Sequence, residues 1–151
     1  MVTVSYCSVD HMPDHEVDRY LRLLPGQMQH EVTKYRYASD RKSCLLARLM
    51  LYESLAHEGL AHLLQGWTRD SNNKPCVAGW GPFNISHSGG MVLFSKAENV
   101  TGIDIEKRLA INYGDLLYHF HGRERAYITE APDALEAFYD IWVKKEAFLK
   151  A

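Results

Sequence analysis

The chain has 151 residues, of which 46% are hydrophobic and 24% charged, a balance typical of a globular domain in water. Its formal net charge of −2 gives no overall basic field for nucleic acid, and no apolar run approaches the roughly 20 residues that span a membrane. We therefore expect a cytoplasmic protein that binds neither nucleic acid nor membrane, with Cys7, Cys44 and Cys76 as reduced thiols.

Strand and helix patterns follow one another in the first half of the chain. The alternation of apolar residues in 2–6 predicts an opening strand, and the apolar spacing in 14–24 predicts a helix. A stronger helix is predicted to begin at a cap at Ser39 or Asp40 and to end near Gly59.

The middle of the chain is predicted to be rich in strands. Turn-forming residues dominate 71–82 and indicate loops around a short strand. Residues 83–87 and 91–95 form two predicted strands joined by the hairpin turn 88–90, and 100–106 is predicted as a third strand.

The end of the chain is predicted to be helical. Residues 113–130 are expected to be helical in part, and Pro132 opens a helix that reaches the last residue. Its apolar stripe consists of Leu135, Phe138, Trp142 and Leu149. Such a stripe needs a partner surface, and we expect that no strands remain to supply one.

Two acids in the predicted third strand are candidate metal ligands. Strand residues two apart point the same way, so Asp104 and Glu106 share one face while Ile103 and Ile105 share the other. Close carboxylates repel unless a cation lies between them, and Mg²⁺ binds through one or two carboxylates together with substrate phosphates. Taken alone, this pattern is weak and is better explained by a solvated strand face.

Four further polar residues acquire meaning only in combination. Trp142, Glu146 and Lys150 lie along one helix face, where a buried acid needs a partner or a ligand, although an ion pair at the stripe edge explains them too. His87 precedes the glycine turn, whose backbone amides could cradle a phosphate, and Lys74 lies in a loop. Taken alone, His87 is explained as an incidental histidine of the hairpin and Lys74 as an ordinary loop lysine.

Four motifs in one order are nevertheless similar to a known family. They are Asn-Lys-Pro at 73–75, Phe-Asn-Ile-Ser-His-Ser at 83–88, Thr-Gly-Ile-Asp-Ile-Glu at 101–106 and Trp-Val-Lys-Lys-Glu-Ala-Phe-Leu-Lys at 142–150. Together they resemble the 4′-phosphopantetheinyl transferase superfamily, of the type that activates carrier domains of peptide, polyketide and fatty-acid synthases.

The resemblance implies an α+β fold with pseudo-two-fold symmetry. Residues 1–100 would form the first, nucleotide-holding half, and 101–151 a second half with the metal site. Relatives continue into further strands after the last motif, so the second half is expected to be incomplete. When complete, such a protein is expected to be a monomer.

The resemblance also implies roles for individual residues. Asp104, Glu106 and Glu146 would bind Mg²⁺ on the pyrophosphate of coenzyme A. Glu146 is the candidate base and Lys150 the candidate group that stabilises the leaving phosphate. The residues implied to bind coenzyme A itself are Lys74, Ser86, His87, Ser88, Lys145 and Arg41. Arg41 enters because Ser43 stands where many members carry an arginine, and Lys42 is an alternative to it.

The implied reaction transfers 4′-phosphopantetheine from coenzyme A to a serine of an acyl or peptidyl carrier protein and releases 3′,5′-ADP. Two alternatives remain open at this point. The chain could be an inactive remnant of the family that binds coenzyme A, or an unrelated Mg²⁺-dependent phosphohydrolase built on the same acids.

Overall fold

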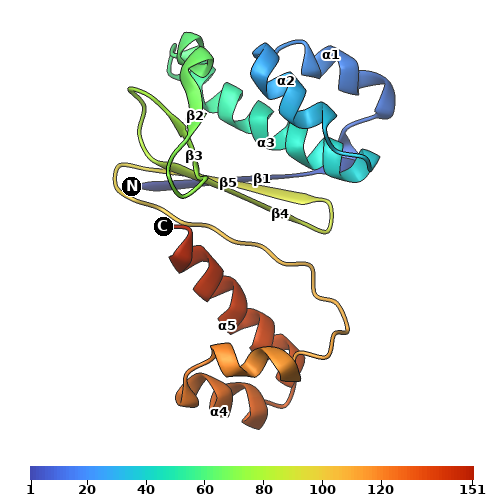
Figure 1. Cartoon of the computed structure of the whole chain (residues 1–151), viewed down its shortest axis with the longest axis vertical. Helices are drawn as coiled ribbons and strands as arrows, with labels where there is room; N and C mark the ends of the chain where they lie inside the picture. Colours follow the sequence, from blue (N-terminus) through green and yellow to red (C-terminus); the bar gives the residue numbers. More distant parts are fainter.

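An antiparallel sheet of three strands lies at the centre of the computed structural model, which describes residues 1–151 (Figure 1). The strands are β1 (Val2–Ser8), β4 (Phe83–Ser88) and β5 (Met91–Ala97), in the order β1-β5-β4. Gly89 and Gly90 join β4 to β5 with φ angles of 57° and 84°, a conformation that glycine adopts without strain. The predicted opening strand, hairpin and α+β class are confirmed.

One face of the sheet is covered by the long helix α3 (Ala38–His57), with α1 (Val17–Leu21) and α2 (Gly26–Thr33) beside it (Figure 1). The predicted cap at Ser39 or Asp40 is wrong, because α3 begins after Tyr37 and no side chain caps it. The predicted end is confirmed, since α3 stops just before Gly59, whose φ is 74°.

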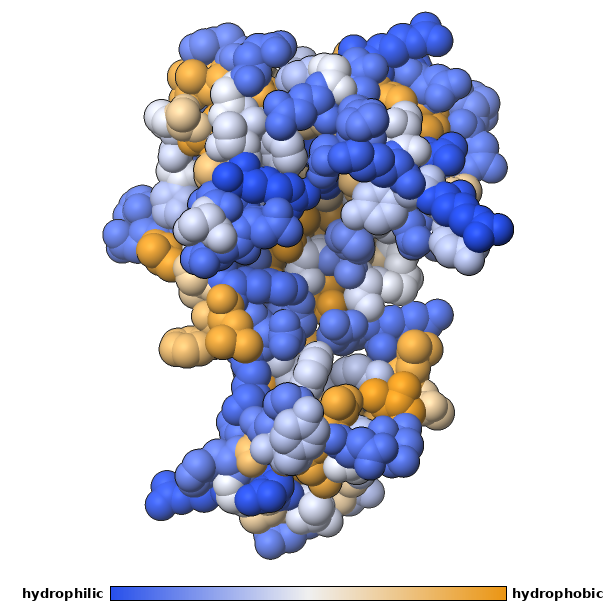
Figure 2. Space-filling view, in the orientation of Figure 1, coloured by the Kyte–Doolittle hydropathy of each residue, from blue (hydrophilic) through white to orange (hydrophobic).

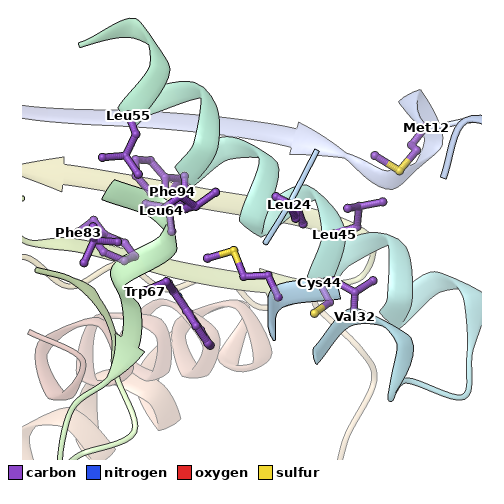
Figure 3. Close-up of a cluster of buried hydrophobic side chains, with 13 residues drawn as sticks. Met12, Leu24, Val32, Cys44, Leu45, Leu55, Leu64, Trp67, Phe83 and Phe94 are labelled. Carbon is purple, nitrogen blue, oxygen red and sulfur yellow. The ribbon is translucent and has the colours of Figure 1, made fainter. Parts of the chain in front are cut away.

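The main core lies between α3 and this face of the sheet (Figure 3). It contains 13 buried residues, namely Met12, Leu24, Met28, Val32, Cys44, Leu45, Leu51, Leu55, Leu64, Trp67, Val77, Phe83 and Phe94. They come from helices, strands and loops between residues 12 and 94, so this part of the chain has a hydrophobic core of its own.

Smaller elements complete the first part. Short 3-10 helices span Val9–His11, Asp14–Glu16 and Ala61–Gly66, and β2 (Trp67–Arg69) pairs with β3 (Pro75–Val77). The short strand expected within residues 71–82 is confirmed as β3, whereas β2 was not predicted. The helix predicted over 14–24 is present only as a 3-10 turn followed by α1. Cys7, Cys44 and Cys76 are all free thiols, as expected.

The second part consists of a 3-10 helix (Gly114–His119), α4 (Gly122–Glu130) and α5 (Ala134–Leu149). A second cluster of buried residues joins them, namely Phe120, Ile128, Ala137 and Phe138. The apolar stripe of α5 therefore has a partner surface, contrary to the expectation from sequence. Leu149 was wrongly placed in that stripe, because the cluster ends at Trp142 and Leu149 is 76% exposed.

The connection between the two parts departs most from the prediction. Residues 100–113 contain no strand, so the predicted third strand is wrong. The connection instead runs past the sheet on the side away from α3 and continues to the helical end of the molecule (Figure 1). Hydrophobic residues gather on the visible surface near the level where α5 approaches the sheet (Figure 2). None of the helices is both long and apolar enough to cross a bilayer.

Candidate functional site

The connection carries the two candidate metal ligands, and side chains of β4 hold it in place. Three backbone N–H groups of the connection donate hydrogen bonds to these side chains. The bonds join Ile103 to Asn84 Oδ1 at 3.2 Å, Ile105 to Ser86 Oγ at 3.3 Å and Lys107 to Ser88 Oγ at 2.9 Å. The expected strand is thus replaced by an extended segment bound through side chains.

Asp104 and Glu106 share one face of this segment, as predicted, and both accept hydrogen bonds from β4. Ser86 Oγ donates to Asp104 Oδ1 at 2.8 Å, and Ser88 Oγ donates to Glu106 Oε2 at 3.0 Å. The Asp104 side chain is only 2% exposed, and its Oδ2 atom is buried with no hydrogen-bond partner. A buried carboxylate oxygen without a partner is costly, so this atom is the best candidate in the site for binding a cation.

The C-terminal end of α5 meets the same place. Lys150 Nζ forms an ion pair with Asp104 Oδ1 and donates to Ser86 Oγ at 3.2 Å. The backbone oxygen of Lys150 accepts hydrogen bonds from Asn84 Nδ2 at 3.2 Å and from Lys74 Nζ at 2.6 Å. Four segments far apart in the sequence, those that carry Lys74, Ser86, Asp104 and Lys150, therefore converge.

Gly102 permits the close approach of the connection to α5. A Cβ atom at this position would overlap the carbonyl oxygen of Ala147 and lie 2.8 Å from the backbone nitrogen of Ala151. Any side chain here would push the connection away from the last turn of α5.

Other residues with implied roles lie elsewhere in this structure. The Lys145 ammonium lies 2.8 Å from a carboxylate oxygen of Glu124 and 5.5 Å from the centre of the Phe120 ring. This ammonium is the main reason why the pKa of Glu124 is lowered. Arg41 Nη2 donates to the backbone oxygen of Tyr35 at 3.2 Å, and its Nε is buried without a partner.

The structure does not gather the three implied metal ligands. Glu146 is half-buried, and no group of three or more His, Cys, Asp or Glu side chains is placed to hold one metal ion. Asp104 and Glu106 instead line a cavity of about 410 Å³ with Ile105, Arg108, Glu136, Tyr139, Asp140 and Val143. The carboxylate oxygens of this cavity and the unpartnered Asp104 Oδ2 fit a hard divalent cation. Because Glu146 is not gathered with them, the set of three acids stays a prediction.

His87 lies at the end of β4. Protein surrounds the imidazole on several sides although part of it faces solvent, and this partial burial lowers the pKa of His87. Arg48 and Lys150 lower the pKa further, while Asp40 and Glu106 oppose them. These causes together favour the neutral imidazole over the protonated one.

Sequence reasoning missed Asn84 and treated it only as part of a motif. The available signal is that Asn84, Ser86 and Ser88 are polar and lie two residues apart in β4, so that they share one face of the strand. Polar residues on one face of a strand need partners when that face is covered. His121 and Glu124 form the capping box of α4.

The fold and site define an α+β protein in which a lysine- and acid-lined site lies where a sheet meets a closing helix. The family described as "4′-phosphopantetheinyl transferase, N-terminal" matches residues 12–99, and the 4′-phosphopantetheinyl transferase superfamily matches residues 101–151. The chain belongs to this superfamily.

Curated relatives agree with that assignment. The chain is 29% identical over 154 residues to the L-aminoadipate-semialdehyde dehydrogenase-phosphopantetheinyl transferase of Mus musculus, covering 87% of the chain and 48% of the relative. It is 23% identical over 144 residues to the 4′-phosphopantetheinyl transferase ffp of Bacillus subtilis, covering 92% of the chain and 64% of the relative. The chain thus spans between about half and not quite two thirds of the length of these two relatives.

Proposed function

We propose that this chain carries the site for transfer of 4′-phosphopantetheine from coenzyme A to a serine of an acyl or peptidyl carrier protein, with release of 3′,5′-ADP. The observation that carries the proposal is that Ser86 and Lys150 meet on the buried carboxylate of Asp104, whose Oδ2 has no partner, while Lys74 binds the backbone oxygen of Lys150. Two lysines and an available carboxylate are the groups that a polyanionic substrate with a bound cation requires.

Asp104, Glu106 and Glu146 would hold Mg²⁺, which neutralises charge on a pyrophosphate when it is bound. The chain's own residues perform the other tasks. Lys150 and Lys145 would bind the pyrophosphate oxygens, and Lys150 is close enough to Asp104 to act at the same centre.

The nucleotide would be held by the first part of the chain. Lys74 and His87 would hold the 3′-phosphate of coenzyme A, with Arg41 as a further cation. The lowered pKa of His87 favours the neutral imidazole, so this role requires the bound phosphate to favour uptake of a proton there. We propose that 1–100 and 101–151 are the two halves of this arrangement, acting as a monomer in the cytoplasm.

The transfer step makes one phosphorus–oxygen bond and breaks another. The carrier serine hydroxyl attacks the β-phosphorus of coenzyme A, and the bond between this phosphorus and the oxygen of the departing 3′,5′-ADP breaks. The serine proton goes to Glu146. Glu146 suits this role because the structure leaves it half-buried at the last turns of α5, near Lys150.

The test combines titration calorimetry with mass spectrometry. We expect coenzyme A to bind in the presence of Mg²⁺ and a carrier protein to gain one phosphopantetheine group on its serine. Glu146→Gln should abolish the gain without unfolding the chain, whereas Glu53→Gln, at an exposed position of α3, should leave it unchanged. No coenzyme A binding would refute the proposal, and binding without transfer would establish the inactive remnant instead.

A further inference from the structure

We propose that Ser86 and Ser88, together with Asn84, are positioning residues that hold Asp104 and Glu106 in place. This assignment rests on the proposed function, because it concerns the acids of that site. It differs from the role that the family resemblance implies for both serines, which is contact with the phosphate chain of coenzyme A.

The first argument is the regularity of the contacts. The bonded pairs 103 with 84, 105 with 86 and 107 with 88 are each 19 residues apart. Both segments therefore advance in the same direction by two residues per contact, as two neighbouring parallel strands would. The side chains of β4 take the place of backbone acceptors, and this fixes the register of the acidic segment.

The second argument is the hydrogen-bonding capacity of Ser86. A hydroxyl has one proton to donate and two lone pairs that accept. Ile105 N–H and Lys150 Nζ can only donate to Ser86 Oγ, at 3.3 Å and 3.2 Å, so they occupy both lone pairs. The Ser86 proton must then point to Asp104 Oδ1, and no capacity remains for a phosphate.

Ser88 repeats the arrangement one step along the strand. It accepts a hydrogen bond from Lys107 N–H at 2.9 Å and donates to Glu106 Oε2 at 3.0 Å. Each serine thus binds at the same time the carboxylate of one acid and the backbone N–H of the residue that follows that acid. Groups that orient metal ligands in this way affect metal affinity although they do not touch the metal.

Asn84 extends the arrangement to α5. Its Oδ1 accepts from Ile103 N–H, and its Nδ2 donates to the backbone oxygen of Lys150 at 3.2 Å. One amide therefore connects the start of the acidic segment to the end of the helix that carries Glu146. Asn84, Ser86 and Ser88 together fix the positions of Asp104 and Glu106 relative to β4 and α5.

The test uses the full chain with Ser86→Ala, Ser88→Ala and Ser88→Thr, and Ser95→Ala as the control. Ser95 is a buried serine on the same face of the sheet, and its hydroxyl lies 3.4 Å from that of Thr101 and contacts no acid. Without metal or coenzyme A, amide hydrogen exchange should accelerate at Ile105 in Ser86→Ala and at Lys107 in Ser88→Ala. Mn²⁺ affinity, measured by electron paramagnetic resonance, should fall roughly 10- to 100-fold in both.

Ser88→Thr retains a hydroxyl at a half-buried position and should restore Mn²⁺ affinity, and Ser95→Ala should change neither measurement at Ile105 or Lys107. Unchanged exchange in the alanine variants, or faster exchange with unaltered Mn²⁺ affinity, would overturn the proposal. So would a loss of coenzyme A affinity in metal-free Ser86→Ala, since that result assigns Ser86 to the phosphate chain. A wild-type chain that binds Mn²⁺ but not coenzyme A would contradict the proposed function and leave these readouts valid.

Discussion

Replacing Lys150 by Met removes the only ammonium group that pairs with the buried carboxylate of Asp104. The side chain of Asp104 is 2% exposed and that of Lys150 is 35% exposed, so the pair lies at the edge of the protein interior. Met keeps the length and the apolar stem of the side chain. The backbone oxygen of Lys150 also keeps its bonds to Lys74 and Asn84, so the substitution removes the ion pair with Asp104 and the hydrogen bond to Ser86 Oγ but leaves these backbone contacts in place.

The magnitude follows from this mixed exposure. Removing one partner of a buried ion pair costs about 3–5 kcal/mol, and a pair exposed to solvent contributes about 0–1 kcal/mol. We expect Lys150→Met to lower the free energy of unfolding by about 1.5–3 kcal/mol, the range of a hydrogen bond to a charged group. For a chain of this size the melting temperature should then fall by roughly 3–12 °C.

The assay is thermal unfolding followed by circular dichroism, with and without Mg²⁺. Saturating Mg²⁺ should stabilise Lys150→Met more than wild type, because the cation replaces the lost positive charge beside Asp104. Lys144→Met is the control, since Lys144 pairs with Asp140 on the exposed side of the same helix, where an ion pair contributes little to stability. The same loss for Lys150→Met in an Asp104→Asn background would refute the reasoning, because no carboxylate is left there to pair.

Two further predictions concern His87 and Gly102. The pKa of His87 is lowered in the folded state, mainly by burial and then by Arg48. The contribution of the neutral imidazole to stability is therefore complete above about pH 6.5, the ordinary histidine pKa, and is lost as the pH falls from there through the lowered pKa. His87→Asn should therefore reduce the decline of melting temperature between about pH 7 and pH 5, and an unchanged decline would contradict this. Gly102→Ala should lower the free energy of unfolding, measured in urea, by about 1–3 kcal/mol, because the new Cβ overlaps the Ala147 carbonyl. Gly122→Ala is the control and should not destabilise the chain, because the space around Gly122 is open. Equal effects of the two substitutions would contradict the close approach at Gly102.

Local patterns were sufficient to predict the elements whose partners are close in the sequence. The hairpin of β4 and β5 follows from alternating residues around Gly89 and Gly90, and the end of α3 follows from Gly59. The N-cap of α3 was misplaced by two or three residues, because Ser39 and Asp40 are good capping residues that the helix absorbs into its first turn.

The extended segment shows where sequence patterns fail. A period of two between Ile103 and Glu106 predicts extended backbone, and this is correct in so far as the two acids share a face. It does not reveal whether the partner is a backbone edge or a row of side chains. That choice depends on Asn84, Ser86 and Ser88, which lie 19 residues earlier in each pairing.

The expected function of Lys74 conflicts with its position in the structure. Its ammonium group has three N–H donors, and three backbone oxygens accept from it, those of Thr101 at 3.1 Å, Lys150 at 2.6 Å and Ala151 at 3.3 Å. Lys74 cannot hold a nucleotide phosphate and keep all three bonds, because no donor is left over. Binding of coenzyme A through Lys74 must therefore release at least one contact that ties the end of α5 to the first part of the chain. Under the proposed function we therefore expect occupation of the nucleotide site to move the end of α5, and with it Glu146, which is not gathered with Asp104 and Glu106.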